Sequence, residues 1–338
     1  MMPEGPEVAS LADSLNQRLG TAFSMISTPS VVAAKTPVHA NSEATTVRLK
    51  RAEIISGRYN KRNPDGWGIL QKYMSDSSVE LLLSAVHTRG KFIYFTFSSH
   101  PDLSLWSTLG LAGGWSFQSS SHCRLKLTFE KRQRHTQKPN ETIFLYFHDA
   151  RNFGTFKVCN DRTELDQKLK KLGIDWLHKD PKNRINLSQF IALGKAAAKR
   201  NRPLAVFLMD QSKTAGIGNY LLSEVLYLSK IHPFALCGSL DDASWKILYT
   251  TIRDTIRLSY FSQTQLDGVL FDENDELLAR RDDRKDYSRF EFIIYAQKYT
   301  RDTGERVVRQ EGLHKRTIHW VPSIQTKHAP DEYPLLPS

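Results

Sequence analysis

Apolar residues recur every three or four positions near the start of the chain. These positions are Val8, Leu11, Ala12, Leu15 and Leu19. Their spacing predicts an amphipathic helix, which Pro6 begins and Gly20 ends. A single short helix of this kind is unstable alone, so we expect it to pack against the rest of the chain.

The next part of the chain is rich in β-branched and aromatic residues, with Gly, Ser and Pro clusters between the runs. This composition predicts strands. The expected strands are Thr46–Ile55, Lys91–Phe97, Leu103–Leu111, Arg124–Phe129 and Thr142–Phe147. Two polar stretches, Gly57–Gly68 and Lys131–Asn140, are expected to be surface loops or insertions. The basic run inside the second stretch could contact a phosphate backbone or simply be solvated.

From about Thr163 the apolar spacing becomes helical. The expected helices are Leu165–Leu172, Leu187–Lys199, Pro203–Gln211, Tyr220–Lys230 and Ala243–Phe261, the last capped by Asp241 or Asp242. After a charged segment, Asp272–Arg289, strand-like composition returns at Phe290–Lys298, Glu305–Arg309 and Thr317–Val321. The proline-containing tail after Gln325 is expected to be disordered.

Charge narrows the class of partner. Among 338 residues there are 47 Lys and Arg against 36 Asp and Glu, a formal net charge of +11. The excess predicts an anionic partner, nucleic acid ahead of a membrane surface, although basicity can also serve solubility alone. Cys123, Cys159 and Cys237 are isolated, which argues against a disulfide framework or a thiolate zinc site. With no apolar run of the roughly 18–20 residues that span a bilayer and no secretory signal, we expect an intracellular protein.

The first residues can carry chemistry. If Pro3 becomes the first residue, its ring nitrogen is a secondary amine. An α-amino group has a pKa of roughly 7.7–8.0, so part of it is neutral at physiological pH and can attack a carbon. The alternative is a disordered terminus that only begins the following helix.

Three further motifs could contact nucleic acid. Lys91 opens a strand and could lie on a phosphate or at a solvated edge. Arg151 and Phe153 share a turn that ends in glycine and could act as a wedge between bases, and Leu111 lies in a second tight turn. Each of these could also be an ordinary turn.

The segment Gly216–Glu224 joins two expected helices. Its two glycines, Gly216 and Gly218, would expose backbone N–H groups at a helix N-terminus, which is a natural phosphate seat. Asn219 could cap the helix or donate to phosphate. The segment lacks the third glycine and the strand–turn–helix setting of a dinucleotide site, so we reject a nucleotide cofactor. Arg316, at an expected hairpin turn, could reach a phosphate or be an ordinary surface arginine.

Together these motifs resemble those of the formamidopyrimidine-DNA glycosylase/endonuclease VIII family of base-excision repair enzymes. They are Pro3–Glu7, Gly90–Lys91, Asp149–Gly154, Gly216–Glu224 and Arg316–Thr317, in the family's order. The resemblance covers the chain from Pro3 to about Gln325. It implies an α+β multidomain fold: an N-terminal helix on an antiparallel β-sandwich (residues 1–160), a helical helix-two-turn-helix domain (161–289), a β-hairpin finger (290–325) and a disordered tail (326–338).

The resemblance also implies an activity. It is that of a bifunctional DNA glycosylase and AP lyase that excises oxidised bases and requires no cofactor. Pro3 resembles the nucleophile that forms a Schiff base at C1′, after which β- and δ-elimination cut the strand. Glu4 is similar to the acid that protonates the sugar ring oxygen, and Glu7 and Glu224 to acids that support it. Lys91 is similar to the lysine on the phosphate next to the lesion.

The same resemblance assigns DNA contacts. Leu111, Arg151 and Phe153 match the triad that fills the void left by an extruded base, although Leu111 stands where methionine is common. Asn219 and Arg316 match the residues that clamp phosphates. The implied partner is damaged double-stranded or single-stranded DNA, bound by a monomer without a membrane. The implied location is intracellular, and nuclear if the source is eukaryotic.

The sequence departs from the family pattern in its finger. The family's usual finger carries four cysteines, but Val321 and Ile324 occupy the positions of the second pair, and no cysteine follows Cys237. The hairpin therefore resembles the zincless finger of some members, and we predict no bound metal. Its order must come from apolar packing, for which the candidates are Tyr295, Val307, Ile318 and Trp320.

A second departure lies at the start, where Met1 and Met2 precede Pro3. Removal of Met1 alone would leave Pro3 in an amide, so the chemistry requires that both methionines be absent. The rival hypothesis is a non-catalytic binder of damaged or single-stranded DNA, which would not need Glu4, Glu7, Lys91 and Glu224 together. An RNA-binding helical module is disfavoured by the strand-rich first half. The preferred lesion, the opposite base and the strand preference stay open.

Overall fold

The computed structural model describes residues 3–21, 45–133, 139–178, 183–263 and 290–332. The chain divides into two compact units, one of Met1–Pro3 with Val8–Lys170 and the other of Glu4–Glu7 with Lys171–Ser338. The first unit thus runs to Lys170, and Glu4–Glu7 group with the second unit. The predicted domain boundary after residue 160 stays a prediction. Within the described parts, no helix combines the length and apolar character that crossing a bilayer requires.

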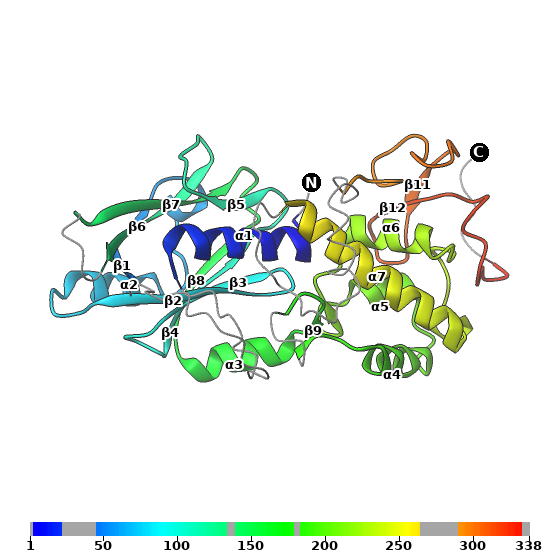
Figure 1. Ribbon diagram of the computed structural model, residues 1–338, viewed down its shortest axis with the longest axis horizontal. Helices are drawn as coiled ribbons and strands as arrows, with labels where there is room; N and C mark the ends of the chain where they lie inside the picture. The colour runs from blue at the N-terminus through cyan, green and yellow to red at the C-terminus, as the bar shows by residue number, and fades with distance from the viewer. Residues whose placement is uncertain (1–2, 22–44, 134–138, 179–182, 264–289, 333–338) are drawn as a thin grey trace, which may run out of the picture. The chain divides into compact units, whose positions relative to one another are not determined.

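The first unit contains an eight-stranded sheet in which every neighbouring pair is antiparallel. Its strands are β1 (Thr45–Ile54), β2 (Leu81–Arg89), β3 (Phe92–Phe97), β4 (Leu103–Thr108), β5 (Gly113–Ser116), β6 (Cys123–Gln133), β7 (Glu141–Asp149) and β8 (Thr155–Asn160). Their order across the sheet is β5-β7-β6-β1-β2-β3-β4-β8 (Figure 1). Alternate residues along β7 are buried, as expected for strands with one face in a core.

The sheet folds over on itself into the predicted sandwich. Trp115 belongs to β5 at one edge of the strand order, yet its ring lies 5.4 Å from that of Phe95 on β3 and 6.0 Å from that of Phe156 on β8. The indole N–H also donates to Ser107 on β4, at 3.2 Å. Contacts between opposite ends of the strand order require two facing layers, which enclose one apolar core.

Helix α1 (Gly5–Leu19) contributes its apolar stripe, including Val8 and Leu15, to that core. Asn16 fastens the helix to β2, because its side chain donates to the Val86 carbonyl at 2.7 Å and accepts from the Val86 N–H at 2.8 Å. A short 3₁₀ turn, η1 (Gly57–Asn60), and helix α2 (Trp67–Ser75) follow β1. The helix corrects the prediction of a loop up to Gly68, because buried Trp67 and Leu70 anchor it.

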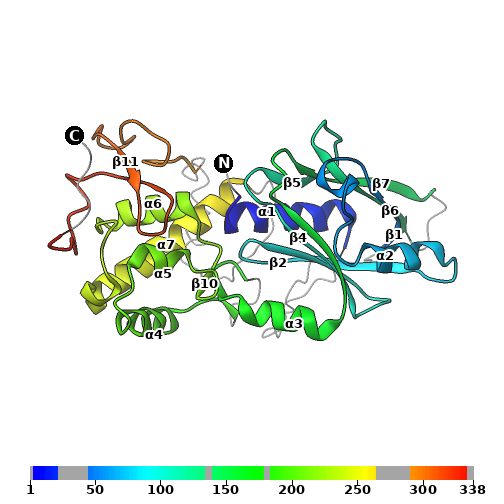
Figure 2. The same cartoon turned by 180° about the vertical axis from the view of Figure 1, so that it is seen from behind.

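The second unit is helical, as predicted. After α3 (Arg162–Lys171), which ends at the division, it contains α4 (Leu187–Ala198), α5 (Leu204–Met209), α6 (Asn219–Leu228) and α7 (Asp242–Gln263). Figure 2 shows these helices and β10 (Thr214–Ala215), which pairs in parallel with β9 (Ile174–Asp175), labelled in Figure 1. The 3₁₀ turn η3 (Cys237–Ser239) precedes α7. Asp241 caps α7, since its carboxylate accepts the N–H of Ser244 at 2.7 Å.

The predicted hairpin forms from β11 (Val308–Glu311) and β12 (Thr317–Trp320), paired antiparallel. The strand expected at Phe290–Lys298 is absent from this described segment. Its backbone N–H groups at 293–295 bond to a buried carboxylate instead of a neighbouring strand, and Ala296 takes a φ of +62° that ends an extended run.

The disordered tail expected after Gln325 is wrong for its described part, residues 326–332. Lys327 bonds through its backbone on both sides: its N–H donates to Lys230 at 3.1 Å and its carbonyl accepts from His232 at 2.9 Å. The His328 ring also lies 2.8 Å from the Ser244 hydroxyl. Backbone pairing, rather than apolar content, orders this segment.

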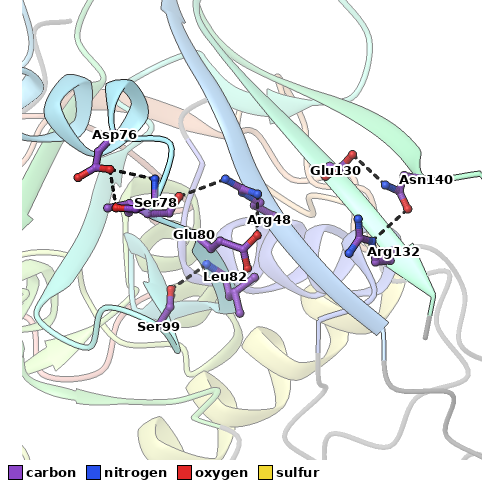
Figure 3. A network of polar contacts seen from close by, with 10 residues as sticks. Arg48, Asp76, Ser78, Glu80, Leu82, Ser99, Glu130, Arg132 and Asn140 are labelled. Carbon is purple, nitrogen blue, oxygen red and sulfur yellow. Dashed lines mark hydrogen bonds and ion pairs between the residues drawn. The ribbon is translucent and has the colours of Figure 1, made fainter. Parts of the chain in front are cut away.

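Surface contacts of the first unit are typified by those in Figure 3. Arg48 on β1 donates to Glu80 at 2.6 Å, and Arg132 on β6 donates to Asn140 at 3.4 Å (Figure 3). Exposed pairs of this kind contribute about 0–1 kcal/mol each. Arg132 belongs to the basic run noted above, of which Arg134 and His135 lie outside the described residues, so a phosphate contact there stays a hypothesis.

Candidate active site

The start of α1 carries one of the two hydrogen bonds of a capping box. Glu4 stands immediately before the first helical residue, Gly5, and its backbone N–H donates to the Glu7 carboxylate at 2.8 Å. This is the reciprocal bond of an N3 glutamate to the N-cap backbone. Pro6 lies between them and loses nothing there, since the first N–H groups of a helix lack partners. Pro3, half-buried, is thereby attached to a well-defined backbone.

The Glu4 side chain reaches the start of α6. It is 1% exposed. One carboxylate oxygen accepts from Gly218 N at 2.7 Å and from Leu221 N at 3.3 Å, and the other accepts from Tyr220 N at 2.9 Å. Gly218 is the N-cap residue of α6 and makes no side-chain cap bond of its own. The carboxylate of Glu4 therefore caps α6 and lies at the positive end of its dipole.

This cap corrects the predicted phosphate seat. The N–H of Gly218 donates to Glu4, and the N–H of Gly216 donates to the Gln211 side chain at 2.9 Å. Both glycines are buried. Gly216 is a glycine for another reason, because its φ is +113°. Its carbonyl accepts the N–H of Gly5 at 2.9 Å. In this structure neither glycine offers its N–H to an outside anion.

Glu7 has two partners in the second unit besides Glu4. Its other carboxylate oxygen accepts from the Tyr220 hydroxyl at 2.7 Å and from the Gln263 amide at 2.8 Å. Burial, reinforced by the charges of Glu7 and Glu4, raises the pKa of Tyr220 well above its usual value. The phenol is therefore a stable hydrogen-bond donor at neutral pH, and it holds Glu7 in place.

Glu224 lies further along α6 and is also 1% exposed. Its carboxylate accepts three backbone N–H groups, from Ile293 at 3.0 Å, Ile294 at 3.0 Å and Tyr295 at 2.8 Å. Burial raises the pKa of Glu224 above its usual value, and these three donors offset the effect only in part. The residue anchors the segment that leads into the hairpin, so its predicted catalytic role stays a prediction.

The two predicted phosphate clamps of the second unit lie together. The Asn219 amide donates to the Thr317 carbonyl at 2.7 Å, next to exposed Arg316. The Asn219 oxygen lies 3.0 Å from Nε2 of His314, which must donate because that oxygen can only accept. Asn219 does not cap α6, since Gly218 takes the cap position. Its second amide hydrogen leaves it able to donate to an anion.

Lys91 belongs to the first unit. It occupies the second position of the two-residue turn between β2 and β3, after Gly90, whose φ is +56°. A positive φ at the first turn position is typical of tight hairpin turns, and glycine adopts it without strain. Lys91 therefore comes from a rigid turn, half-buried, rather than from the strand itself.

The predicted wedge residues also belong to the first unit, and the structure brings their turns together. Phe153 is 60% exposed and Leu111 is 36% exposed, unusual for large apolar side chains. The two turns touch, because a Cβ at Gly110 would lie 2.6 Å from the Gly154 nitrogen. Arg151 is exposed on the same loop as Phe153.

The hairpin has an apolar core where the family's usual finger has cysteines. Val321 is fully buried and packs with Tyr227, Ile294 and Val307, and Ile324 packs against this cluster. Of the four residues expected to provide the packing, Val307 belongs to the cluster, and Ile318 and Trp320 are buried nearby in sequence. The ring of Tyr295 makes a tilted contact with that of His319, with 4.8 Å between the ring centres. Val321 and Ile324 carry no metal-ligating atoms, so these residues do not fit a zinc ion.

Three residues of this region were not identified from sequence. Tyr220 and Gln263 hold Glu7, and His314 holds Asn219. Tyr220 stands next to Asn219 in the glycine-containing segment, so its place at a helix start was a usable signal. Gln263 and His314 are brought to their partners only by the tertiary fold.

Comparisons with known proteins concern the helical domain and the fold. Residues 177–265 match the model of the formamidopyrimidine-DNA glycosylase H2TH domain. The chain is 27% identical to the formamidopyrimidine-DNA glycosylase of Mycoplasma pneumoniae over 55% of this chain and 63% of that protein. It is 26% identical to that of Ligilactobacillus salivarius over 84% of this chain and 97% of that protein. The Psychromonas ingrahamii relative is matched over 64% of its length.

Solved structures show the same fold. The Lactococcus lactis formamidopyrimidine-DNA glycosylase, bound to DNA containing an AP site, superimposes with a TM-score of 0.64 at 18% identity, covering 96% of this chain and all of that one. The Thermus thermophilus MutM (Fpg) protein superimposes with a TM-score of 0.64 at 20% identity, covering 97% of this chain and 100% of that one.

The fold and the H2TH match define a helix-two-turn-helix protein with the architecture of the formamidopyrimidine-DNA glycosylases. Residues 177–265 carry the H2TH domain of these enzymes, and the chain as a whole is similar to the formamidopyrimidine-DNA glycosylase/endonuclease VIII family. The resemblance drawn from its sequence motifs and the predicted α+β fold are thus confirmed.

Proposed function

We propose that this protein is a bifunctional DNA glycosylase and AP lyase of base-excision repair, with Pro3 as its nucleophile. One observation carries the proposal. Glu4 is locked on both sides, by its side chain on the start of α6 and by its backbone N–H on Glu7. An amine one residue earlier is therefore held in a defined direction, which an attacking group needs.

The proposed chemistry uses no diffusible cofactor. The neutral amine of Pro3 attacks C1′ of the damaged nucleotide, the base leaves, and an iminium forms between proline and sugar. The iminium acidifies the adjacent sugar proton, so β-elimination and then δ-elimination break the two flanking phosphate bonds. A positioned acid and base add about 10²–10⁴-fold. The base must first leave the helical stack, which costs a few kcal/mol and less at a damaged pair.

The proposed roles of the remaining residues follow the family pattern. Glu4 protonates the ring oxygen of the sugar, although in the free protein its carboxylate accepts three N–H groups, so it would have to take up a proton with DNA bound. Glu7 supports Glu4, and Lys91 contacts the phosphate next to the lesion. Leu111, Arg151 and Phe153 fill the void in the duplex.

The DNA clamp is proposed to consist of Asn219 and Arg316; Asn219 binds the carbonyl of Thr317, the residue after Arg316. The substrate is damaged DNA, double- or single-stranded, bound by a monomer inside the cell, and in the nucleus if the source is eukaryotic. Relatives solved with DNA carry an AP site or a Fapy-dG lesion, which makes ring-opened purine a first substrate to try.

Borohydride reduction with an oligonucleotide that carries an abasic site tests the proposal. Protein whose N-terminus is verified as Pro3 should form a covalent adduct, with the DNA mapped to Pro3 by mass spectrometry. Protein that retains Met2 is the matched control and should form none, because its proline nitrogen is an amide. If the Pro3-terminal protein binds abasic DNA but gives no adduct, the non-catalytic binder is the better description.

A further inference from the structure

Two arginines outside the proposed chemistry contact the loop that carries Phe153. Arg58 lies in η1, in the polar stretch that the sequence suggested was a surface loop. Its guanidinium donates to the carbonyl of Asn152 at 3.1 Å and to the carbonyl of Gly154. These two carbonyls flank Phe153, so one side chain bridges both sides of the exposed ring.

Arg124 on β6 holds the beginning of the same loop. Its Nε donates to the Asp149 carbonyl at 2.8 Å, and its terminal nitrogen donates to the Ser56 hydroxyl at 2.8 Å. Ser56 immediately precedes η1 and donates in turn to the Cys123 carbonyl. The two arginines therefore join η1 to the loop at both of its ends.

Hydrogen bonds within the loop also fix its conformation. Asp149, 1% exposed, accepts the N–H of Gly154 at 2.6 Å and that of Arg151 at 3.3 Å. Glycine is required where η1 approaches, because a Cβ on Gly57 would lie 2.6 Å from the Arg124 side chain and 2.8 Å from the Asn152 oxygen. Against this rigid support, Phe153 stands 60% exposed. The exposed ring is therefore carried by backbone that hydrogen bonds hold on both sides of it.

We propose that Arg58 and Arg124 are positioning residues that hold the Asp149–Gly154 loop in its wedge conformation before DNA binds. The inference rests on the proposed function, since the wedge acts on a duplex. Arg58 and Arg124 donate to carbonyls on both sides of Phe153, so the ring can enter a base stack without the loop first having to be ordered. Ordering backbone costs conformational entropy, so removing the brace should weaken duplex opening about tenfold.

The test compares Arg58→Met, which keeps the length of the side chain and removes its donors, with Arg62→Met. Arg62 is four residues away in the same stretch, carries the same charge and is 88% exposed with a loose contact to Asp65. Amide hydrogen exchange of the 150–154 peptide is measured without DNA. Exchange should be about tenfold faster in Arg58→Met than in Arg62→Met and wild type.

The functional readout is borohydride trapping on an abasic site in duplex and in single-stranded DNA, because only the duplex needs a wedge. The ratio of duplex to single-strand trapping should fall about tenfold in Arg58→Met, mostly through KM rather than kcat. Arg58→Lys should recover part of the ratio, since one ammonium can reach only one carbonyl well. Arg62→Met should match wild type.

Unchanged hydrogen exchange in Arg58→Met would overturn the proposal that Arg58 positions the loop. An equal fall in trapping on duplex and on single-stranded DNA would also overturn it, because a general loss of structure gives that result. Wild-type protein that traps neither substrate would remove the proposed function, and with it the wedge. The exchange measurement does not depend on activity, so the two failures are distinguishable.

Discussion

Two buried glutamates of the second unit, Glu4 and Glu224, use the same chemistry in different places. Each is 1% exposed and accepts three backbone N–H groups. Glu4 takes its donors from the start of α6, and Glu224, itself on α6, takes its donors from residues 293–295. A buried carboxylate of this kind accepts backbone N–H groups that would otherwise be buried without a hydrogen-bond partner.

What differs is the residue each glutamate positions. The residue before Glu4 is Pro3, the proposed nucleophile, whereas the segment bound by Glu224 leads into the β11–β12 hairpin. Both residues appeared in the sequence as acids of one catalytic group. In the structure Glu4 binds the start of α6 beside the proposed nucleophile and Glu224 binds the segment that leads into the finger, and the catalytic role predicted for each stays a prediction. A buried glutamate within a catalytic motif is thus not by itself evidence of proton transfer.

The largest expected effect comes from Glu4→Gln. An amide can replace at most one acceptor oxygen, so the start of α1 should shift relative to α6, and a displacement of about 1 Å can cost about 100-fold in rate. We expect borohydride trapping by Pro3-terminal protein to fall about 100-fold. Glu224→Gln should lose less than about tenfold, since its donors belong to the finger segment.

Equal losses in these two variants would contradict the comparison and return Glu224 to the catalytic group. Circular dichroism of both variants at the assay temperature checks that each is folded when trapping is measured. Asp76→Asn serves as the control, because that carboxylate accepts only the N–H and hydroxyl of Ser78 in an exposed turn of the first unit. Its trapping should equal that of wild type.

The second prediction concerns stability. In Glu224→Gln at least one of the N–H groups of 293–295 loses its acceptor, at a cost of about 1–3 kcal/mol for each unpaired buried group. Hydrogen exchange should therefore accelerate in the segment 290–300 by about 10–100-fold, with little change in the β-sandwich. Acceleration spread evenly over both units would show that Glu224 supports the whole fold rather than the finger.

The features that depend on residues close together in the sequence could be predicted from it. The helical stripe of Val8–Leu19, the helices of the second unit and the turn that carries Arg151 and Phe153 all follow from local pattern. Glu4 and Glu7 were found because they stand in the Pro3–Glu7 motif, whose resemblance to the glycosylase family singled them out.

The missed features depend on contacts across long separations. The N–H groups of Gly216 and Gly218 looked available for phosphate because local pattern cannot show that Gln211 and Glu4 occupy them. The segment Phe290–Lys298 has strand composition, but its donors go to Glu224. Arg58 read as a solvated loop residue because the carbonyls that it bridges lie 94 and 96 positions away.

A third prediction follows from His319 on β12, next to the segment that Glu224 holds. Burial, reinforced by the charge of Arg309, lowers the pKa of His319 to about 4, and its Nδ1 has no hydrogen-bond partner among the described residues. The unfolded chain takes up this proton near its ordinary pKa of about 6.5. Stability is therefore complete above about pH 6.5 and is lost as the pH falls toward about 4, by about 3 kcal/mol at most.

Chemical denaturation at about pH 7.5 and about pH 5 measures this loss, and His319→Gln should reduce it by about 2 kcal/mol. The difference between variant and wild type isolates His319, because the other titrating groups are the same in both proteins, and among them Glu224 acts in the opposite direction. Its pKa is raised, so its contribution to stability improves on acidification. Identical pH slopes in the two proteins would show that the pKa of His319 is the same in the folded and unfolded states.

A smaller effect is expected from Tyr220→Phe. The change removes the hydroxyl that donates to Glu7 at 2.7 Å and lies 3.2 Å from Ser259. Glu7 keeps Gln263 and the Glu4 N–H as donors, so the free energy of unfolding should fall by about 1 kcal/mol. Trapping should fall only about threefold, because Glu4 retains all three of its own donors. A loss as large as that of Glu4→Gln would mean that Tyr220 acts on the substrate directly.

The smallest expected effect is that of adding a metal chelator. The family's usual finger depends on cysteine ligands, whereas here Val321 and Ile324 pack in an apolar cluster and Glu224 binds the incoming backbone. A strong chelator should therefore shift the melting temperature by less than about 1 °C, well below the roughly 2–4 °C expected for each kcal/mol lost in Glu224→Gln. Purified protein should contain no stoichiometric zinc by elemental analysis. Bound zinc, or a chelator effect as large as that of Glu224→Gln, would mean that the hairpin is held by ligands other than this carboxylate and its apolar core.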